Sequence, residues 1–241
     1  MSEQSGKNVK KNGVLKKEIS SAPLAIGEQK QELRSRIREE LRLLKCGELC
    51  VSEREEHAGS MEAFLRSDLP PVSKEVADAA ILENVRRLPA YASAQTVFCF
   101  IGVRREIDTR ALIERMLSEG KQVCVPRCGA PGQMEACALH SLSELKKGQF
   151  GIPEPPESAA VILPEQIDLM LLPCFAVRPD GLRLGQGGGY YDRYMERFHG
   201  VSAALCRETF VLEHIPAEPH DRYVEFIVTE RGVRKCRGKN L

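Results

Sequence analysis

The chain has 241 residues, of which 35 are lysine or arginine and 34 are aspartate or glutamate, giving a formal net charge of +1. This near-neutral balance gives no reason to expect nucleic acid as the main partner, because nucleic-acid-binding domains carry a marked basic excess. Hydrophobic residues make up 42%, which is enough for a core and too many for a disordered chain. No apolar run approaches the ~20 residues that span a bilayer, so we expect no membrane association.

Both ends of the chain are basic. Residues 1–27 carry five lysines and two glutamates, and residues 231–241 carry three arginines and two lysines without an acid. Residues 1–27 also lack hydrophobic periodicity and any apolar run of the ~7–15 residues found in a secretory signal. We predict a disordered basic extension over 1–27, one ordered domain over 28–232 and a basic tail over 233–241.

The nine cysteines are interpreted as free thiols rather than as disulfide partners or zinc ligands. Their number is odd, and the sequence holds no Cys-x-x-Cys pair of the kind common in zinc sites. Four of them fall inside apolar, strand-like runs, where cysteine packs as a small hydrophobic residue. This pattern favours a reducing, cytoplasmic location. The four are Cys99, Cys124, Cys137 and Cys206.

The ordered part begins with an amphipathic helix predicted to start near Glu28. Its leucines and isoleucine repeat at the spacing of one helical face, and lysine and arginine occupy the other faces. After a less regular stretch at residues 46–71, Ser73 is predicted to cap a second helix, from Lys74 to Leu88. The apolar face of the first helix consists of Leu33, Ile37, Leu41 and Leu44.

After Pro89 the pattern changes to short apolar runs rich in β-forming residues. Asp108 is predicted to cap a helix over residues 109–118, which ends before Gly120. Strands that alternate with helices indicate an α/β fold: a single three-layer domain with a mostly parallel central sheet flanked by helices. The strands are predicted at 96–101, 123–126, 134–139, 167–172, 201–206 and 224–229.

The most informative stretch follows the fourth predicted strand and reads RLGQGGGYYDR over residues 183–193. Glycines allow positive φ and close approach of a ligand, and bare N–H groups ahead of a helix predicted over 190–198 suit a phosphate. Arg183 adds a charge-assisted contact, and Asp192 either favours the helix dipole or helps to hold Mg²⁺. A mobile linker is the alternative interpretation. The stretch is neither a P-loop nor a Rossmann fingerprint.

The stretch at residues 183–193 resembles the signature of the 5-formyltetrahydrofolate cyclo-ligase family, also called 5,10-methenyltetrahydrofolate synthetases. The resemblance spans about residues 28–232 and is most specific in the glycine-rich segment. Three further pieces resemble the family in the right order. They are the basic helix with Lys30 and Arg34, the segment 100–109 with the Val-Pro-Arg of 125–127, and the closing stretch 212–230.

The resemblance implies an ATP-dependent ligase that forms a C–N bond, converting 5-formyltetrahydrofolate to 5,10-methenyltetrahydrofolate with release of ADP and phosphate. It implies ATP and Mg²⁺ as cofactors, phosphorylation of the formyl oxygen and ring closure by N10. The implied fold is shared with sugar-phosphate isomerases and CoA transferases, so the fold alone does not give the function. An inactive folate- or nucleotide-binding module is the alternative. We expect a monomer whose partner is a reduced folate, with an oligomer left open.

The same resemblance gives roles to individual residues. Lys30 and Arg183 are assigned to catalysis, and Asp192 and Asp221 to the metal. The ATP contacts are Lys30, Arg34, Arg127, Arg183, Leu184, Gly185, Gln186, Gly187, Gly188, Gly189, Tyr190 and Tyr191. The folate contacts are Phe100, Glu106, Gln186, Gly187, Gly188, Gly189 and Tyr190.

The sequence also departs from the family pattern. Ala176-Val177-Arg178 stands where members often have Ala-Phe-Asp, and Gln186 occupies a position that is frequently aromatic or basic. The stretch at 46–71 is longer than the usual link between the first two helices, and both charged ends are additions. These differences leave the strongest motif positions unchanged.

Overall fold

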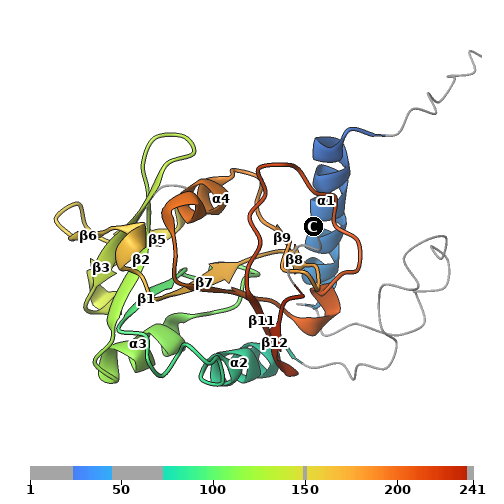
Figure 1. Cartoon of the computed structure of the whole chain (residues 1–241). Coiled ribbons are helices and arrows are strands. Elements are labelled where there is room, and N and C mark those ends of the chain that lie inside the picture. The colour runs from blue at the N-terminus through green and yellow to red at the C-terminus, as the bar shows by residue number, and fades with distance from the viewer. Residues whose placement is uncertain (1–23, 45–72, 149–150, 238–241) are drawn as a thin grey trace, which may run out of the picture.

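The computed structural model describes residues 24–44, 73–148 and 151–237, and its centre is an eight-stranded sheet (Figure 1). The order of the strands across the sheet is β12-β11-β10-β7-β1-β2-β3-β6. Their bounds are β1 Thr96–Cys99, β2 Gln122–Cys128, β3 Met134–Leu139, β6 Val161–Ile162, β7 Leu169–Pro173, β10 Val201–Leu205, β11 Phe226–Thr229 and β12 Gly232–Lys235.

The five central strands β11, β10, β7, β1 and β2 run parallel to one another. The antiparallel strands lie toward the edges, where β12 pairs with β11 and β3 pairs with β2 and β6. The mostly parallel sheet predicted from the sequence is therefore confirmed. Two small sheets accompany it, formed by β4 (Lys146–Lys147) with β5 (Pro153–Glu154), and by β8 (Ala176–Val177) with β9 (Arg183–Leu184).

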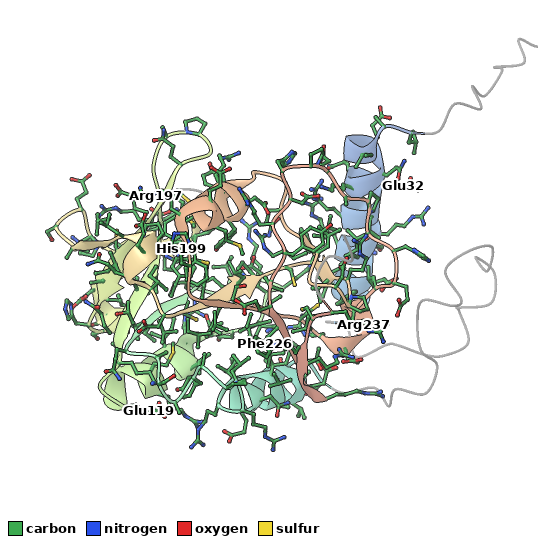
Figure 2. The ribbon with its side chains drawn as sticks, viewed as in Figure 1. Glu32, Glu119, Arg197, His199, Phe226 and Arg237 are labelled. Atoms are coloured by element: carbon green, nitrogen blue, oxygen red, sulfur yellow. The ribbon has the colours of Figure 1, made fainter. Side chains whose placement is uncertain are left out.

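Helices cover both faces of the sheet and complete three layers (Figure 1). Side chains of α2 (Lys74–Val85) and α3 (Arg110–Ser118) pack into one core, and those of α1 (Ile26–Leu44) and α4 (Tyr190–Tyr194) pack against the other. Within β1 the side chains alternate as a strand requires: Val97 and Cys99 join the α2–α3 core, whereas Phe98 joins the α1–α4 core. Glu32, labelled in Figure 2, lies on the exposed side of α1.

The predicted helix starts differ in their accuracy. The side chain of Ser73 accepts a hydrogen bond from the N–H of Val76 at 3.3 Å, which confirms the cap of α2. The prediction for α3 is wrong by one residue, because the helix begins at Arg110. Asp108 still accepts the N–H of Arg110 at 3.2 Å, but the capping position belongs to Thr109, whose hydroxyl donates to the carbonyl of Phe100 at 2.5 Å.

Two boundaries predicted from the sequence need correction. The helix α1 begins at Ile26, inside the predicted extension, whose residues 1–23 lie outside the described part of the chain, as does the 46–71 stretch. The tail predicted from residue 233 is wrong at its start, because β12 continues the sheet as an antiparallel edge strand. Charged residues are common on such edges, where they discourage pairing with another chain.

The four cysteines predicted to be buried are each at most 2% exposed, which confirms their place in the core. Burial raises the pKa of the Cys99 thiol to about 12, so it stays protonated and packs as an apolar group. Within the described ranges, no helix is both long enough and apolar enough to cross a membrane.

Candidate active site

The candidate site lies at the carboxyl edge of the parallel strands, where two chain paths diverge. The loop after β1 leads through α3 to β2, whereas the chain after β7 leads through β8, β9 and α4 to β10 on the other side. Because β1 and β7 are neighbours, the strand order reverses between them, and ligands of open α/β sheets bind at such a point. The loop after β1 carries Glu106, and the chain after β7 carries the glycine-rich segment.

The glycine loop, residues 185–189, has a backbone shape that requires glycine. Gly187 and Gly189 have φ values of +98° and +66°, in the left-handed region. A Cβ added to Gly188 would lie 2.7 Å from the ring of Tyr190, and one added to Gly189 would lie 2.7 Å from Nη1 of Arg193. Residues 186–188 are exposed, so the loop presents bare backbone to an approaching ligand.

The helix after the glycine loop is shorter than the sequence predicted. It spans Tyr190–Tyr194, and a 3-10 turn over Met195–Arg197 follows, so the prediction of a helix over 190–198 is wrong. Five helical residues build only a small dipole, because the dipole sums over aligned peptide units. A phosphate at this loop would therefore be attracted mainly by cationic side chains.

Lys30 is one of these cations. It lies on α1, which is anchored to the core by Ile37 and Leu41, and is itself only 5% exposed. Its ammonium lies 2.8 Å and 2.7 Å from the two carboxylate oxygens of Asp221 and 2.8 Å from Oε2 of Glu218. The sequence assigned Lys30 to phosphates and Asp221 to a metal, and the structure places the two assigned groups in direct contact.

Arg34 is one turn further along α1 and reaches the glycine loop directly. Its Nε donates to the carbonyl of Gly185 at 2.8 Å, and a Cβ on Gly187 would lie 3.2 Å from its Cζ. Burial lowers the pKa of Arg34, with repulsion by Arg38 as the next cause. The loop and the first helix, far apart in the sequence, therefore form one cationic rim.

Arg183 lies beneath the loop with its side chain 2% exposed. Its Nη2 donates to Oδ1 of Asp192 at 2.9 Å and lies 3.7 Å from the sulfur of Met195. Its guanidinium lies over the ring of Tyr191, 5.6 Å from the centroid, and burial raises the pKa of that tyrosine. Among the described residues, Nε of Arg183 is a buried donor without a hydrogen-bond partner, so this guanidinium keeps capacity for a further acceptor.

Of the two residues predicted to bind the metal, Asp221 belongs to a converging group of ligand side chains, whereas Asp192 lies on the segment beside it. Oδ1 of Asp192 accepts the N–H of Arg222 at 3.2 Å, so Asp192 borders the turn that carries Asp221. In the described part of the chain, the group of side chains able to share a metal is Glu218, His220 and Asp221, whose ligand atoms lie within 4.8 Å of one another. Carboxylate oxygens are the ligands that Mg²⁺ prefers, and the ammonium of Lys30 among them shows that this position accommodates a cation. The donor set therefore fits Mg²⁺.

Glu218 and His220 were absent from the site predicted from the sequence. The signal was present, because both precede Asp221 within four residues, in the Glu-x-His-Asp run. A turn closed by a hydrogen bond from the N–H of Asp221 to the carbonyl of Glu218, at 3.1 Å, brings these side chains together. Spacing within a turn does not reveal which side chains converge, so the sequence alone favoured only the aspartate.

Glu106 connects the loop after β1 to the glycine loop. Its Oε1 accepts from the side-chain amide of Gln186 at 3.2 Å, and its Oε2 accepts the N–H of Val103 at 3.1 Å. Burial raises the pKa of this carboxyl, against the lowering effect of the two hydrogen bonds. A partly buried carboxylate beside a glycine loop suits a flat ligand with N–H donors.

Some predicted site residues lie elsewhere or are buried. Arg127 is tied to Glu135, at 2.8 Å, and to the carbonyl of Pro156, at 2.8 Å, rather than to the glycine loop. Phe100 is 2% exposed and packs in the α2–α3 core, and Leu184 is 1% exposed in the α1–α4 core. Tyr190 and Tyr191 are half-buried, Tyr190 beside Arg193 and Tyr191 edge-on to Phe98.

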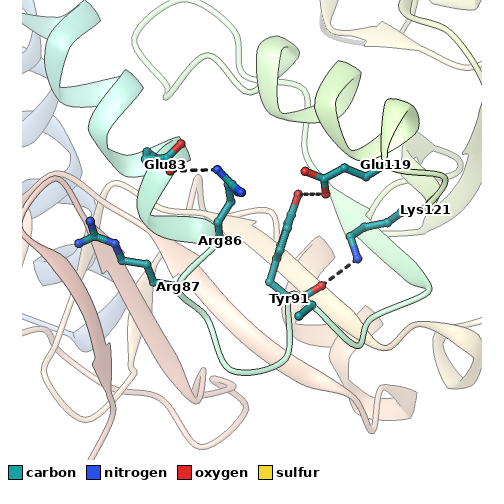
Figure 3. A pocket seen from close by; sticks show the side chains of 7 residues that line it. Glu83, Arg86, Arg87, Tyr91, Glu119 and Lys121 are labelled. Carbon is teal, nitrogen blue, oxygen red and sulfur yellow. Dashed lines mark hydrogen bonds and ion pairs between the residues drawn. The ribbon is translucent and has the colours of Figure 1, made fainter.

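A separate pocket of about 590 Å³ lies near the amino ends of β1 and β2, away from the glycine loop (Figure 3). Several of its polar groups are engaged with one another: Tyr91 donates to Glu119 at 2.8 Å, and Lys121 donates to the carbonyl of Tyr91 at 2.8 Å. Figure 2 shows Glu119 and Arg197, which follows α4, on opposite sides of the molecule. The pocket is therefore distinct from the candidate site.

The fold and the site together define an α/β protein with a glycine loop, bordered by arginine side chains, at its switch point. Residues 26–230 match the model of the 5-formyltetrahydrofolate cyclo-ligase family, so the chain belongs to this family. A 5-formyltetrahydrofolate cyclo-ligase of Mycolicibacterium smegmatis is 29% identical over 193 residues, covering 68% of this chain and 98% of that protein. That of Escherichia coli K12 is 28% identical over 170 residues, covering 68% and 93%. The family predicted from the glycine-rich segment is confirmed.

Solved structures agree with this assignment. A 5,10-methenyltetrahydrofolate synthetase of Aquifex aeolicus superposes with a TM-score of 0.65 at 26% identity, covering 88% of this chain and 95% of that one. One from Mycoplasma pneumoniae superposes with a TM-score of 0.54 at 18% identity, covering 68% and 90%, which shows a shared fold.

Proposed function

We propose that this protein is a 5-formyltetrahydrofolate cyclo-ligase that uses ATP and Mg²⁺ to form 5,10-methenyltetrahydrofolate. The observation that carries the proposal is the contact between Gln186 of the glycine loop and Glu106, at 3.2 Å. It joins a cationic, phosphate-type rim to a carboxylate suited to a pterin, as an enzyme that brings ATP to a folate requires. The match of residues 26–230 to the family model supports the same conclusion.

In this proposal the phosphates of ATP are bound by the cationic side chains beside the glycine loop. Lys30 and Arg34 lie one helical turn apart on α1, and Arg34 contacts the loop, so both can face one polyanion. Arg183, with its unpartnered Nε, supports the loop from below and adds positive charge. Bound ATP supplies the phosphoryl group that makes the formyl oxygen a leaving group. The protein's part is to neutralise charge and to fix geometry.

In this proposal the metal is bound by Asp192 and by the turn that carries Glu218, His220 and Asp221. Asp221, Glu218 and His220 already converge, and Asp192 lies beside the same turn through its bond to the N–H of Arg222. The ammonium of Lys30 lies against the carboxylates of Glu218 and Asp221. We infer that Lys30 turns from Asp221 to the phosphates when Mg²⁺ enters, so that one residue couples the two sites.

In this proposal the folate is bound by the loop after β1 and by Tyr190. Glu106 accepts hydrogen bonds, and its amide partner Gln186 is exposed and free to move aside. A pterin ring carries N–H donors that match this carboxylate, and Tyr190 offers a half-buried ring for stacking. The cytoplasmic location and the monomeric state expected from the sequence remain predictions.

The test is to incubate the full chain with 5-formyltetrahydrofolate and Mg-ATP, and to follow the absorbance of the methenyl product together with ADP release. We expect both to rise with time and neither to rise when ATP is omitted. Tight folate binding without product would refute the enzyme and favour the inactive binding module. ADP release without methenyl product would refute the assigned acceptor of the phosphoryl group.

A further inference from the structure

The loop between β1 and α3, residues 100–109, carries Glu106 in a constrained shape. Arg104 has a φ of +56°, which is uncommon outside glycine. A Cβ on Gly102 would lie 1.8 Å from the carbonyl oxygen of Ile107, so the two arms of the loop touch backbone to backbone. A backbone held in a sparsely populated conformation persists only when surrounding contacts determine it.

A buried ion pair supplies such contacts. Oδ1 of Asp78, on α2, lies 2.5 Å from Nη2 of Arg207, which follows β10, and the two side chains are 7% and 10% exposed. Each partner also holds the backbone of the loop. Nη1 of Arg207 donates to the carbonyl of Arg105 at 3.2 Å, and Oδ2 of Asp78 accepts the N–H of Asp108 at 3.1 Å. These two backbone groups lie on either side of Glu106.

We propose that Asp78 and Arg207 are positioning residues that orient the Glu106 carboxylate toward the folate. The inference rests on the proposed function, which gives Glu106 the folate contact. The ion pair acts through the backbone at residues 105 and 108. Nε of Arg207 is buried without a hydrogen-bond partner among the described residues. A buried pair with an unsatisfied donor is a poor source of stability, so its value lies in the geometry that it fixes.

The loop is also fixed relative to the ATP side of the site. Nη1 of Arg105 donates to the carbonyl of Arg38 at 2.9 Å, on the helix that carries Lys30 and Arg34. The ion pair, the loop and α1 thus form one connected unit. A small displacement of the folate relative to the phosphates has a large effect on the rate, because the reacting groups need close alignment.

The test compares Asp78→Asn and Arg207→Lys with a matched control, Asp168→Asn. The Asp168 carboxylate also holds a backbone segment, accepting the N–H groups of Gln95 and Thr96 at 2.8 Å and 2.9 Å, but at the amino end of β1. We expect the KM for folate to rise roughly tenfold in the first two variants, the range seen when a group that orients a ligand-contacting side chain is lost. The KM for ATP should change less than twofold.

Arg207→Lys separates charge from geometry, because lysine keeps the charge beside Asp78 but cannot donate to two acceptors as a fork. It should retain most of the stability while the KM for folate rises. In a Glu106→Gln background, Asp78→Asn should raise that KM no further, since residues acting through one group are not additive. Equal increases in both backgrounds, or a folate KM that stays unchanged in Asp78→Asn, would overturn the positioning role.

Amide hydrogen exchange measures how readily the loop opens, and it does not depend on turnover. Exchange over residues 101–109 should be faster in Asp78→Asn than in the unmodified chain, and unchanged in Asp168→Asn. Equal exchange in all three proteins would overturn the inference even in an active enzyme. An inactive unmodified chain would instead refute the proposed function, and faster exchange in Asp78→Asn would then still support the hold of the ion pair on the loop.

Discussion

The ammonium of Lys30 lies 2.8 Å and 2.7 Å from the two carboxylate oxygens of Asp221, although 191 positions separate them in the sequence. Their side chains are 6% and 10% exposed, so this pair is largely shielded from solvent. A cation assigned to phosphate and an anion assigned to metal neutralise each other in this contact. The arrangement predicts that metal and lysine compete for the same carboxylate.

Lys30→Met tests this competition. Loss of the ammonium frees the carboxylates of Asp221 and Glu218, so Mn²⁺ should bind several-fold more tightly without nucleotide, as measured by electron paramagnetic resonance. The KM for ATP should rise by roughly 10- to 100-fold, because a hydrogen bond to a charged group contributes about 1.5–3 kcal/mol. The control is Arg36→Met on the same helix, whose guanidinium pairs with exposed Glu32. Weaker Mn²⁺ binding in Lys30→Met would contradict the competition.

Asp192→Asn tests the second predicted metal ligand while leaving the fold in place. An asparagine oxygen can still accept from Arg183 and from the N–H of Arg222, so the buried guanidinium keeps a partner. Loss of the charge should weaken Mg²⁺ binding by roughly 100-fold, at least the effect of losing an outer partner of a ligand. The measurement is the Mg²⁺ concentration that gives half-maximal turnover.

The matched control for that variant is Asp180→Asn. Asp180 also pairs with an arginine, Arg178, at 2.6 Å, and its side chain is 24% exposed compared with 20% for Asp192. The Mg²⁺ dependence should stay unchanged in the control. Equal Mg²⁺ dependence in Asp192→Asn and the unmodified chain would remove Asp192 from the metal site.

The sequence predicted the fold better than it predicted the contacts within the site. The strand at residues 134–139 is confirmed in its bounds because a short apolar run is a local signal. Arg127 was assigned to ATP, yet it faces Glu135 directly across the β2–β3 pair. A cross-strand partner of opposite charge depends on register, which the sequence pattern alone does not fix.

The helix predicted over 190–198 failed for a related reason. Tyr191 and Tyr194 both pack against Phe98, with ring centroids 6.2 Å and 5.9 Å away. A short helix followed by a 3-10 turn makes the same contacts as a longer helix would. The path of the backbone over these residues therefore depended on tertiary packing, which the sequence pattern does not reveal.

Glu106→Gln should change how stability depends on pH. Burial raises the pKa of Glu106 above its ordinary value of 4.5, so the folded state binds more protons than the unfolded state above that pH. Stability contributed by this group therefore falls as pH rises from 4.5 through the folded pKa. The neutral glutamine lacks this loss, so the melting temperature of the variant relative to the unmodified chain should rise between pH 4 and pH 7.

Glu165→Gln provides a control of opposite sign. A hydrogen bond from its own backbone N–H and contacts with Arg197 lower the pKa of Glu165, so its contribution is lost as pH falls. The melting temperature of Glu165→Gln relative to the unmodified chain should therefore not rise toward neutral pH. A pH-independent difference between Glu106→Gln and the unmodified chain would show that burial does not raise the pKa of Glu106.

Gly189→Ala tests whether the glycine loop serves ATP rather than stability alone. A side chain at a φ of +66° costs about 1–2 kcal/mol, and the added Cβ would lie 2.7 Å from Nη1 of Arg193, whose other nitrogen holds the carbonyl of Gly188. Gly120→Ala has the same type of strain, with a φ of +77° and no atom within 4 Å of its Cβ. Both variants should lose similar stability in denaturant unfolding, but only Gly189→Ala should raise the KM for ATP several-fold. An equal KM in the two variants would assign the loop to the fold and remove it from the nucleotide site.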